Sequence, residues 1–447
     1  MAQAFEDEIV AAGIAGLAAG YRARALDPIA VLDRYHARID RYDGALNGYV
    51  ARDADDARGA AEESRARWAA GNPRSPIDGV PIAVKANIAV AGLPWHAGID
   101  AYRDRIATQD APCIARLRAA GAVILGLANM HEAAAGATTD NRSFGRTHNP
   151  WRHGYSPAGS SGGSGAVVAA GLAAGALGTD TAGSVRLPAA FTGSYGLKPG
   201  YGAISIQGVV PLTTVLDHVG VHARSAGDCA LLFAAAARHG ASPAATAHAA
   251  DRPLRLAQLD LASYGPLDDD IVAALARTAD RARARGHAIE TVPLLGIEVL
   301  GQLSELINAE LFAVHAERRG EAPERFSPFL QRMMAEGGAV SAPALAHAHI
   351  ARIAAADAIR DALAGYDAML MPTAGLRPHS FEAKPDMRVA MFTTLGNLSG
   401  LPAMAFPAGL DRDGLPASVQ ALAWDEATAL HLAATLADEV GAPPGFG

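Results

Sequence analysis

Residues 156–200 limit the possible folds of this chain, because they hold eleven glycines in the 45-residue run SPAGSSGGSGAVVAAGLAAGALGTDTAGSVRLPAAFTGSYGLKPG. Glycine lets backbone N–H groups approach a ligand closely, since no side chain stands in the way. Two separated serine sites, Ser160/Ser161 and Ser184, are each followed by small residues that could open a helix. Gly/Ser-rich runs are often flexible linkers, but AVVAAGLAAGALG is an apolar run suited to burial. The stretch therefore predicts a backbone cradle for an anion or an oxyanion.

Length and composition leave room for a large buried core. The chain has 447 residues, which suggests two or three units, although large α/β enzymes also reach this size. Half of the residues are hydrophobic, and 38 Lys and Arg against 46 Asp and Glu give a net charge of −8. Because no basic block occurs, we expect no nucleic-acid partner.

Cysteine usage and the first residues favour a reduced cytoplasmic compartment. Cys113 and Cys229 are too few for a disulfide framework, and no Cys/His spacing fits a zinc site, so we expect no metal. The N-terminal segment carries acidic groups ahead of its apolar run, where a secretory signal would carry basic ones. It predicts a helix, and no window of the sequence is apolar enough to predict a membrane span.

Helix and strand patterns alternate along the chain, which is typical of α/β proteins with a largely parallel sheet. Residues 1–70 predict N-terminal helices, one of which begins with Asp27 as N-cap and Pro28 at the first helical position. The short apolar run Val80–Val84 predicts a buried strand, and a second strand at 122–126 follows a helix.

The second half of the chain begins with a linker-like segment, GASPAATAHAADRP at 240–253. A β-α-β pattern and a run of helices then occupy about residues 255–365, and strands return towards the C-terminus. Because no internal repeat occurs, we interpret about 255–365 as an inserted or lateral helical part, not as a second independent domain.

Lys85 follows directly after the predicted strand Val80–Val84. Such a lysine can be a surface cation beside a core strand, or a desolvated amine held in a site, and buried lysine is rare. His131, His148 and His153 have spacings that fit no metal motif, so they are interpreted as satisfied or surface histidines.

Two common motifs fit the serine stretch poorly. Residues 159–163 match G-x-S-x-G, the nucleophile elbow, with Ser161 as nucleophile, but that elbow needs a strand directly before it. Here Pro157 stands two residues before Gly159. A phosphate loop is excluded because no G-K-[ST] ending occurs.

A third interpretation accounts for far more of the chain. Lys85 at a strand end, tandem serines after a Gly-rich turn, and a downstream DTAGSVRLPAA resemble the amidase signature family of amide hydrolases. The resemblance extends over nearly the whole chain, from LNGYV and GVPIAVKANI through GSSGGS, GTDTAGSVRLPAAF, GLKPGYGAIS and LDHVG to GLPAMAFPAG and GLPASVQ.

The resemblance implies an α/β fold over residues 1–447, a single amidase domain whose one mixed sheet of roughly ten strands is covered by helices on both faces. It also implies roles for residues. The family's catalytic lysine falls on Lys85, its bridging serine, held by a cis peptide bond, on Ser160, and its acyl-forming nucleophile on Ser184. Its oxyanion hole falls on the backbone N–H groups of Thr181, Ala182, Gly183 and Ser184.

These roles also have a physical basis in the residue types. A serine such as Ser184 is a weak nucleophile until a base takes its proton, and a buried amine can do so once its pKa falls from about 10.4 towards neutrality. The hydroxyl of Ser160 can accept one proton while donating another. We expect Ser161 to position this network, and Asp180 and Arg186 to fix the nucleophile's loop.

The chain departs from the common family spelling at three positions. Ala158 and Ala182 stand where many relatives have glycine, but a methyl group removes no backbone N–H, and DTAGS also resembles allophanate hydrolases. Ala86 follows Lys85 where many relatives have aspartate. One hydrogen-bond partner must therefore be replaced.

The resemblance implies an amidase that converts a carboxamide or ureide to an acid and ammonia without a cofactor. Its expected partner is a small-molecule amide, with a homodimer among the possible assemblies and no membrane. Three alternatives remain: an ammonia-producing component of an amidotransferase, a ureido-specific hydrolase of the allophanate hydrolase type, and a catalytically idle scaffold. Candidate substrate-binding residues, chosen as chemically distinctive and near motif ends, are Trp95, His96, His131, Trp151, Phe392 and Thr393.

Overall fold

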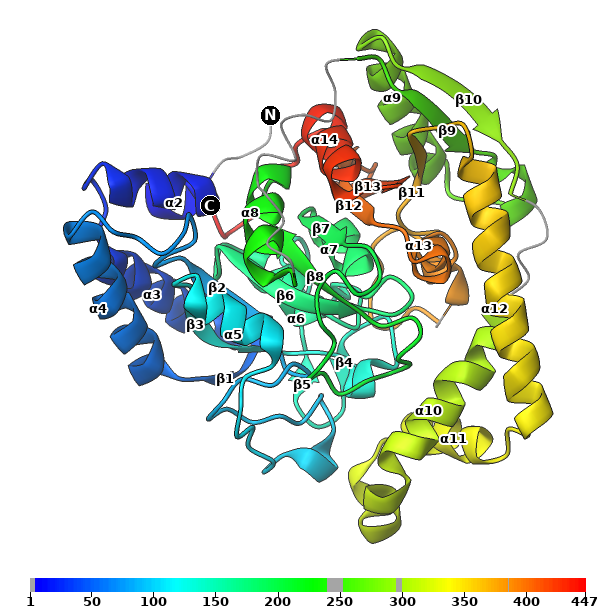
Figure 1. Ribbon diagram of the computed structural model, residues 1–447, viewed down its shortest axis with the longest axis horizontal. Coiled ribbons are helices and arrows are strands. Elements are labelled where there is room, and N and C mark those ends of the chain that lie inside the picture. Colours follow the sequence, from blue (N-terminus) through cyan, green and yellow to red (C-terminus); the bar gives the residue numbers. More distant parts are fainter. Residues whose placement is uncertain (1–4, 239–251, 295–299, 385) are drawn as a thin grey trace.

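The structure describes residues 5–238, 252–294, 300–384 and 386–447. In this part of the chain, the apolar runs of the sequence form the strands of one large sheet (Figure 1). This computed structural model confirms the predicted α/β fold with a single large mixed sheet, which has eleven strands. The linker-like segment 240–253 lies outside the described residues except for its last two positions.

The sheet is less parallel than the sequence pattern predicts. Its strand order is β1-β3-β2-β6-β8-β7-β12-β13-β11-β9-β10. The strands are β1 (Tyr49–Arg52), β2 (Pro81–Lys85), β3 (Val123–Ala128), β6 (Gly175–Asp180), β7 (Tyr195–Lys198), β8 (His218–Ala223), β9 (Arg255–Leu259), β10 (Ala288–Val292), β11 (Ala368–Pro372), β12 (Ala403–Leu410) and β13 (Pro416–Ala423).

Parallel pairs occur only towards the two ends of this sheet. Strands β3, β2 and β6 are mutually parallel neighbours, as are β11, β9 and β10, whereas all the pairs between β6 and β11 are antiparallel. The expected alternation with helices fails in the middle because short links join some strands there. The turn at 411–415 between β12 and β13, for example, permits only antiparallel pairing.

Helices cover both faces of the sheet, as predicted. One face carries α2 (Gly13–Arg22), α5 (Pro112–Ala119), α8 (Ala226–Ala236), α9 (Asp269–Ala284) and α14 (Glu426–Leu436). The other carries α3 (Pro28–Leu46), α4 (Ala54–Ala69), α6 (Gly162–Ala169), α7 (Arg186–Thr192) and α13 (Thr393–Ser399). Asp27 caps α3 by accepting the N–H groups of Ile29 and Ala30, as expected.

The remaining elements lie at the periphery. They are α1 (Glu8–Ala11), α10 (Leu300–Glu321), α11 (Pro328–Gly338), α12 (Ala342–Leu363) and the small ribbon of β4 (Asp140–Asn141) and β5 (Gly145–Arg146). Figure 1 shows α12 along the outer edge of the molecule, with α10 and α11 at one end. The interpretation of 255–365 as an inserted or lateral part stays a prediction. Across the described residues, no helix is both long and apolar enough to cross a membrane.

Three glycines on neighbouring strands let α7 begin directly on the sheet. A Cβ atom at Gly178 of β6 would lie 3.0 Å from Val185 Cγ2, and one at Gly220 of β8 would lie 3.1 Å from it. A Cβ atom at Gly196 of β7 would lie 3.1 Å from the Val185 carbonyl oxygen. Because side chains are missing at these three positions, the residue after Ser184 packs against the bare sheet.

Replacing Gly178 with alanine should disturb this contact. The new methyl group would lie 2.9 Å from Ser161 Oγ, so a neighbour has to move, and overpacking of this kind costs about 1–3 kcal/mol. Chemical denaturation should show that loss for Gly178→Ala. The matched control, Gly59→Ala in α4, has nothing within 4 Å and should gain about 0.5–1 kcal/mol. Equal effects of the two substitutions would contradict this account.

Candidate active site

The lysine and the first serine turn meet at the carboxyl ends of two parallel strands, β2 and β6. Lys85 is the last residue of β2 and is fully buried, and Ser160 lies just before α6. Lys85 Nζ lies 2.7 Å from Ser160 Oγ. The Gly159–Ser160 peptide bond is cis, as the family resemblance implies. The alternative that Lys85 is a surface cation is therefore wrong.

Thr179 completes the surroundings of the Lys85 amine. Lys85 Nζ lies 2.7 Å from Thr179 Oγ1 and 3.5 Å from the Thr179 carbonyl oxygen. Asn87 Nδ2 donates to the same Thr179 Oγ1 at 3.1 Å. A hydroxyl oxygen accepts two hydrogen bonds, so Thr179 can take one N–H from Asn87 and one from Lys85. The lone pair of a neutral Lys85 amine is then left for the hydroxyl of Ser160.

Burial decides the protonation state of this amine. Loss of hydration lowers the pKa of Lys85 to about 7, even though the charges of Asp217 and Asp180 act to raise it. A substantial neutral fraction therefore exists at neutral pH. Ala86, the residue after Lys85, has no polar side chain. Thr179 supplies a hydrogen-bond partner to Lys85 instead.

Ser184 lies in the turn between β6 and α7 and keeps 9% of its surface exposed. The backbone N–H of Ser161 donates to the Ser184 carbonyl oxygen at 3.2 Å, which joins the two serine turns. Ser161 Oγ donates to the Thr179 carbonyl oxygen at 3.1 Å and accepts the Thr179 N–H at 3.3 Å. Ser161 thus ties Thr179, the neighbour of Lys85, to the start of α6.

The backbone N–H groups of this turn are not equivalent. That of Gly183 donates to the Asp180 carboxylate at 2.8 Å. Among the described residues, the other three of the four expected oxyanion donors have no protein acceptor; they are Thr181, Ala182 and Ser184. The N–H of Gly183 is thus already engaged within the protein, and the oxyanion hole stays a prediction.

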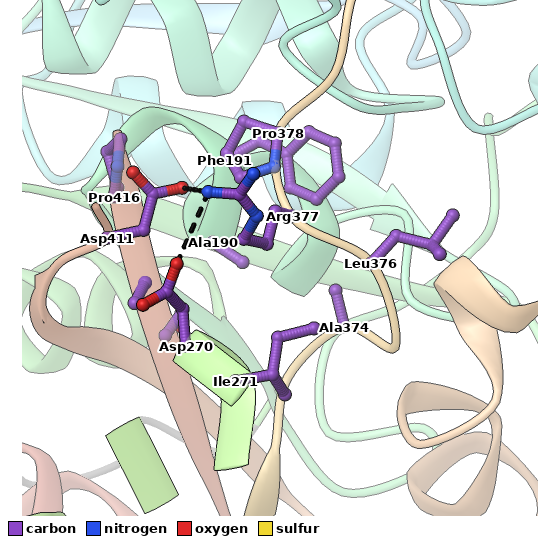
Figure 2. A pocket seen from close by; sticks show the side chains of 12 residues that line it. Ala190, Phe191, Asp270, Ile271, Ala374, Leu376, Arg377, Pro378, Asp411 and Pro416 are labelled. Carbon is purple, nitrogen blue, oxygen red and sulfur yellow. Dashed lines mark hydrogen bonds and ion pairs between the residues drawn. The ribbon is translucent and has the colours of Figure 1, made fainter. Parts of the chain in front are cut away.

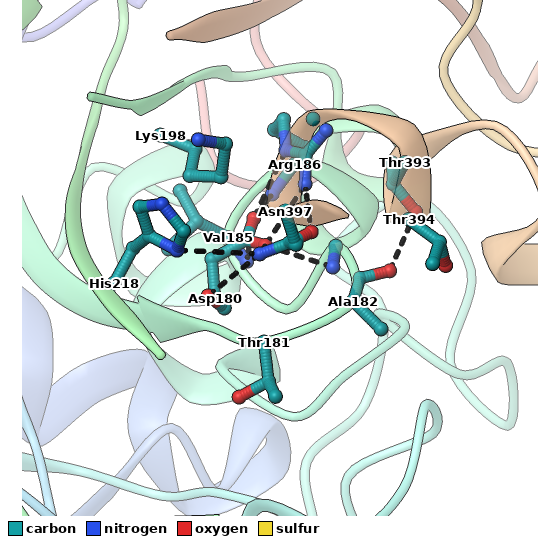
Figure 3. A network of polar contacts seen from close by, with 12 residues as sticks. Asp180, Thr181, Ala182, Val185, Arg186, Lys198, His218, Thr393, Thr394 and Asn397 are labelled. Atoms are coloured by element: carbon teal, nitrogen blue, oxygen red, sulfur yellow. Dashed lines mark hydrogen bonds and ion pairs between the residues drawn. The ribbon is translucent and has the colours of Figure 1, made fainter. Parts of the chain in front are cut away.

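A buried ion pair fixes the turn from behind (Figure 3). Arg186 Nε and Nη2 donate to the two Asp180 carboxylate oxygens at 3.0 and 2.9 Å, and both side chains are fully buried. Asn397 of α13 joins them, since its Nδ2 donates to Asp180 at 2.9 Å and its Oδ1 accepts from Arg186 at 2.7 Å. Gln420 of β13 accepts from Arg186 Nη1 at 2.9 Å.

This network keeps Asp180 ionised. Burial alone would raise the pKa of its carboxyl, but the charge and hydrogen bonds of Arg186, with the charge of Lys198 and a hydrogen bond from Asn397, hold it well below the ordinary value. The carboxylate can therefore accept the N–H of Gly183 throughout the physiological pH range.

Three of the six predicted substrate-binding residues contact either the residues around Lys85 or the turn that carries Ser184. The His131 backbone N–H donates to the Ser160 carbonyl oxygen at 3.0 Å, and burial lowers the pKa of its imidazole to about 4. Trp95 Nε1 donates to the Asn87 carbonyl oxygen at 3.0 Å. Thr393 Oγ1 donates to the carbonyl oxygen of Ala182 at 2.7 Å.

The other three are engaged elsewhere. His96 stacks on Phe144 with ring centroids 4.1 Å apart, and burial lowers the pKa of its imidazole to about 4. Trp151 Nε1 donates to the Thr192 carbonyl oxygen at the far end of α7. Phe392 is fully buried in the core beside α13. Their assignment to substrate binding stays a prediction.

Two cavities lie near this region without including Lys85, Ser160 or Ser184. One, of about 20 Å³, lies at the end of α7, and Figure 2 shows Arg377 pointing towards Asp411 and Asp270 there. The other, of about 290 Å³, lies between α12 and α13 and includes Asn397 in its wall. Among the described residues, no group of His, Cys, Asp and Glu side chains has an arrangement that could hold a metal ion.

Comparison with known proteins decides the family. The sequence profile of the family described as Amidase matches residues 30–430. The chain belongs to this family. The resemblance inferred from the sequence motifs is thereby confirmed.

Individual relatives in the amidase family differ in what their names say. The chain is 44% identical over 232 residues to a glutamyl-tRNA(Gln) amidotransferase subunit of Anaeromyxobacter sp. (strain K), a match that spans 52% of this chain and about half, 47%, of that relative. It is 33% identical to the subunit of the same name from Aromatoleum aromaticum, over 92% of this chain and 93% of that one. The structure of peptide amidase from Stenotrophomonas maltophilia is 28% identical, with a TM-score of 0.82 over 97% of this chain and 98% of that one.

Several residues of the site escape motif analysis. Thr179 and Asn87 belong to the lysine network, and Asn397 and Gln420 contact Arg186, but none of the four was given a role from the sequence. Thr179 stands within GTDTAGS, and Asn397 within the small, polar run MFTTLGNLSGLP. Position within a family motif is thus a signal for Thr179, and also for Asn87 in GVPIAVKANI and Gln420 in GLPASVQ, but not for Asn397.

Removing the positive partner of Asp180 should be costly. In Arg186→Met a buried carboxylate loses its ion pair, and a change of this type lowers the free energy of unfolding by about 3–5 kcal/mol. Urea denaturation at pH 7 measures this loss. As a control, Arg58→Met removes ion pairs of a side chain that is 46% exposed, which are worth about 0–1 kcal/mol. Similar losses for both variants would show that the buried pair has no special weight.

Proposed function

We propose that this chain is an amidase that hydrolyses a carboxamide or ureide C–N bond, giving an acid and ammonia, through an acyl-enzyme on Ser184. The observation that carries the proposal is the 2.7 Å contact between the buried Lys85 amine and the Ser160 hydroxyl. The Ser184 turn lies directly beside this contact, joined to it by the Ser161 N–H bond. Base, bridge and nucleophile can therefore act as one unit.

Acylation begins with proton transfer. Neutral Lys85 accepts the proton of Ser160, and Ser160 accepts the proton of Ser184, so that Ser184 Oγ attacks the substrate carbonyl carbon. Thr179 supports this direction of transfer, because its hydroxyl oxygen accepts an N–H of the amine, beside the one that it accepts from Asn87, and the lone pair of the amine is left towards Ser160.

The tetrahedral intermediate carries negative charge on the former carbonyl oxygen. The free N–H groups of Thr181, Ala182 and Ser184 are the donors proposed for that charge, and one such donor contributes about 2.7–4 kcal/mol in other hydrolases. The Lys85 ammonium then returns a proton through Ser160 to the leaving nitrogen. The C–N bond breaks, ammonia leaves and the acyl group remains on Ser184.

Water completes the cycle by the same path in reverse. Lys85, neutral again, takes a proton from water through Ser160, and the resulting hydroxide attacks the acyl carbon. Ser184 regains its proton as the acid leaves. Every transfer uses a group of this chain, so the proposed reaction calls for no cofactor.

The surroundings suggest where the substrate lies. His131, Trp95 and Thr393 each contact a residue of the lysine network or of the Ser184 turn, so we assign them to the substrate pocket ahead of the other three candidates. The imidazole of His131 is neutral at pH 7 because burial lowers its pKa, which favours an uncharged amide over an anionic group beside it. Two buried free thiols, Cys113 and Cys229, are compatible with a cytoplasmic enzyme.

A second function is favoured by the relatives. Two of them are named as subunits of a glutamyl-tRNA(Gln) amidotransferase, so the same chemistry could release ammonia for a partner enzyme. The two functions differ in their requirement for a partner. The purified chain alone decides between them.

We expect the purified chain to release ammonia from at least one member of a panel of aryl, aliphatic and ureido amides. Hydroxylamine should intercept the acyl-enzyme and yield a hydroxamate, whereas Ser184→Ala should yield neither product. The control, Ser161→Ala, keeps the nucleophile and should still form hydroxamate at a reduced rate. Turnover only after addition of a partner protein and its acceptor would favour the amidotransferase function.

The pH profile should report Lys85. Since the amine must be neutral to act as base and its pKa is about 7, kcat/KM should fall as the pH is lowered below about 7. Lys85→Met should remove this limb and lower kcat roughly 10²- to 10⁴-fold.

Stability provides the control for this variant. Folding lowers the pKa of Lys85, so protonation opposes folding below the unfolded value of about 10.4, fully so below about pH 7. Lys85→Met removes that penalty and should keep or raise Tm at neutral pH. A folded variant with near-normal activity would contradict the assignment of the base.

A further inference from the structure

Asp217 is a buried carboxylate beside the proposed oxyanion turn. It lies just before β8, with 3% of its surface exposed. Thr181 Oγ1 donates to its Oδ1, and the Leu212 N–H donates to its Oδ2 at 2.9 Å. Among the described residues, no arginine, lysine or histidine forms an ion pair with it. Burying a carboxylate without an ionic partner lowers the stability of the folded state. Stability therefore does not explain why Asp217 is there.

The bond to Thr181 fixes a residue of the turn. Thr181 is the first residue after β6, and its backbone N–H is one of the three without a protein acceptor. Its side chain is held by Asp217 on one side of the backbone, while the next peptide unit is held by Thr393 at the Ala182 carbonyl oxygen. Together these bonds fix the backbone at Thr181 and Ala182, the first two residues after β6.

The same carboxylate acts on the lysine. Of the two carboxylates whose charge raises the pKa of Lys85, Asp217 has the larger effect. Asp180 is paired with Arg186, whereas Asp217 has no ion pair with a described residue. The other titratable groups that act on Lys85 or feel its charge are His131, after β3, and His222 of β8, both neutral because burial lowers their pKa.

Asp217 is itself connected to the peripheral helices. Burial raises the pKa of its carboxyl to about 6, and the charge of Glu310 acts in the same direction. Glu310 of α10 accepts the Thr213 hydroxyl at 2.6 Å and the Thr214 N–H at 2.8 Å. The loop that carries Asp217 is thereby anchored to α10.

We infer that Asp217 is a positioning residue for hydrolysis, which orients the oxyanion donors through Thr181 and supplies negative charge that favours the protonated form of the Lys85 amine. The inference rests on the proposed amidase function. It assigns two separable effects to one side chain, of which one passes through a hydroxyl and the other through charge.

Two substitutions separate these effects. Asp217→Asn keeps the shape but removes the charge, so the pKa of Lys85 falls and the acid limb of kcat/KM moves to lower pH, by roughly one unit for a nearby buried charge. Thr181→Val removes only the hydroxyl. It should lower kcat about tenfold or more while KM stays unchanged, because oxyanion donors act in the transition state. Thr181→Ser should restore kcat.

Asp228→Asn is the matched control. Asp228 is a carboxylate with 4% exposure in α8 that accepts the Ala15 N–H at 2.9 Å, and it does not act on Lys85. This variant should leave the acid limb in place. If Asp217→Asn and Asp228→Asn both leave it in place, and Thr181→Val keeps the wild-type kcat, Asp217 is only structural and the inference is wrong.

A fluorophosphonate probe keeps this test independent of the amide substrate. Ser184 Oγ displaces fluoride from phosphorus, and its proton passes to the lysine base, so the labelling rate depends on the same groups. A wild-type chain that is labelled but hydrolyses no amide would refute the proposed function alone. In that case the pH dependence of labelling, measured by mass spectrometry for the same variants, still supports or overturns the inference. Should Asp217→Asn fail to fold, the Thr181 series decides.

Discussion

The ion pair between Asp180 and Arg186 is the interaction on which the rest of the site depends. It joins the end of β6 to the first residue of α7, and through Asn397 and Gln420 it reaches α13 and β13. Taking two charges out of water is unfavourable unless their remaining hydrogen-bond positions are filled. Here backbone N–H groups and two side-chain amides fill them, so the turn that carries Ser184 has one well-defined shape. The proposed chemistry needs that shape, because oxyanion donors act only if they are oriented before reaction.

The structure contains a second fully buried lysine, Lys198, whose surroundings differ from those of Lys85, the proposed base. Lys198 donates to the carbonyl oxygens of Pro199 and Leu401, and burial together with the charge of Arg186 lowers its pKa well below the ordinary value. A lowered pKa is therefore not sufficient. Lys85 has in addition a hydroxyl partner, Ser160. Thr179 Oγ1 accepts one N–H from Lys85 and one from Asn87, so the lone pair of the Lys85 amine is left for Ser160.

Much of the architecture was predictable from the sequence, because local signals and motifs agreed. Asp27 marked a helix start, the strand ending at Lys85 formed, and the motifs identified the family and the mixed sheet. What could not be predicted depends on contacts between distant segments. Asn397 and Asp217 contact the serine turn from later elements; no motif marks Asn397, and the motif LDHVG does not by itself show what Asp217 contacts. The use of the Gly183 N–H by Asp180 is likewise a property of the folded turn, invisible in the spelling DTAGS.

The hydrogen bonds of Arg186 to residues distant in sequence have a consequence for folding during synthesis. Its side chain bonds residues 211 and 234 positions further along the sequence. A growing chain on the ribosome carries Lys85, Ser160 and Ser184 from its first half, but it cannot complete the hydrogen bonds of Arg186 until Gln420 has been synthesised and has emerged. A polypeptide released early would contain these three residues but lack the hydrogen bonds through which Arg186 holds the turn. The turn that holds Ser184 is therefore anchored on all sides only after the C-terminal part of the chain has folded onto it.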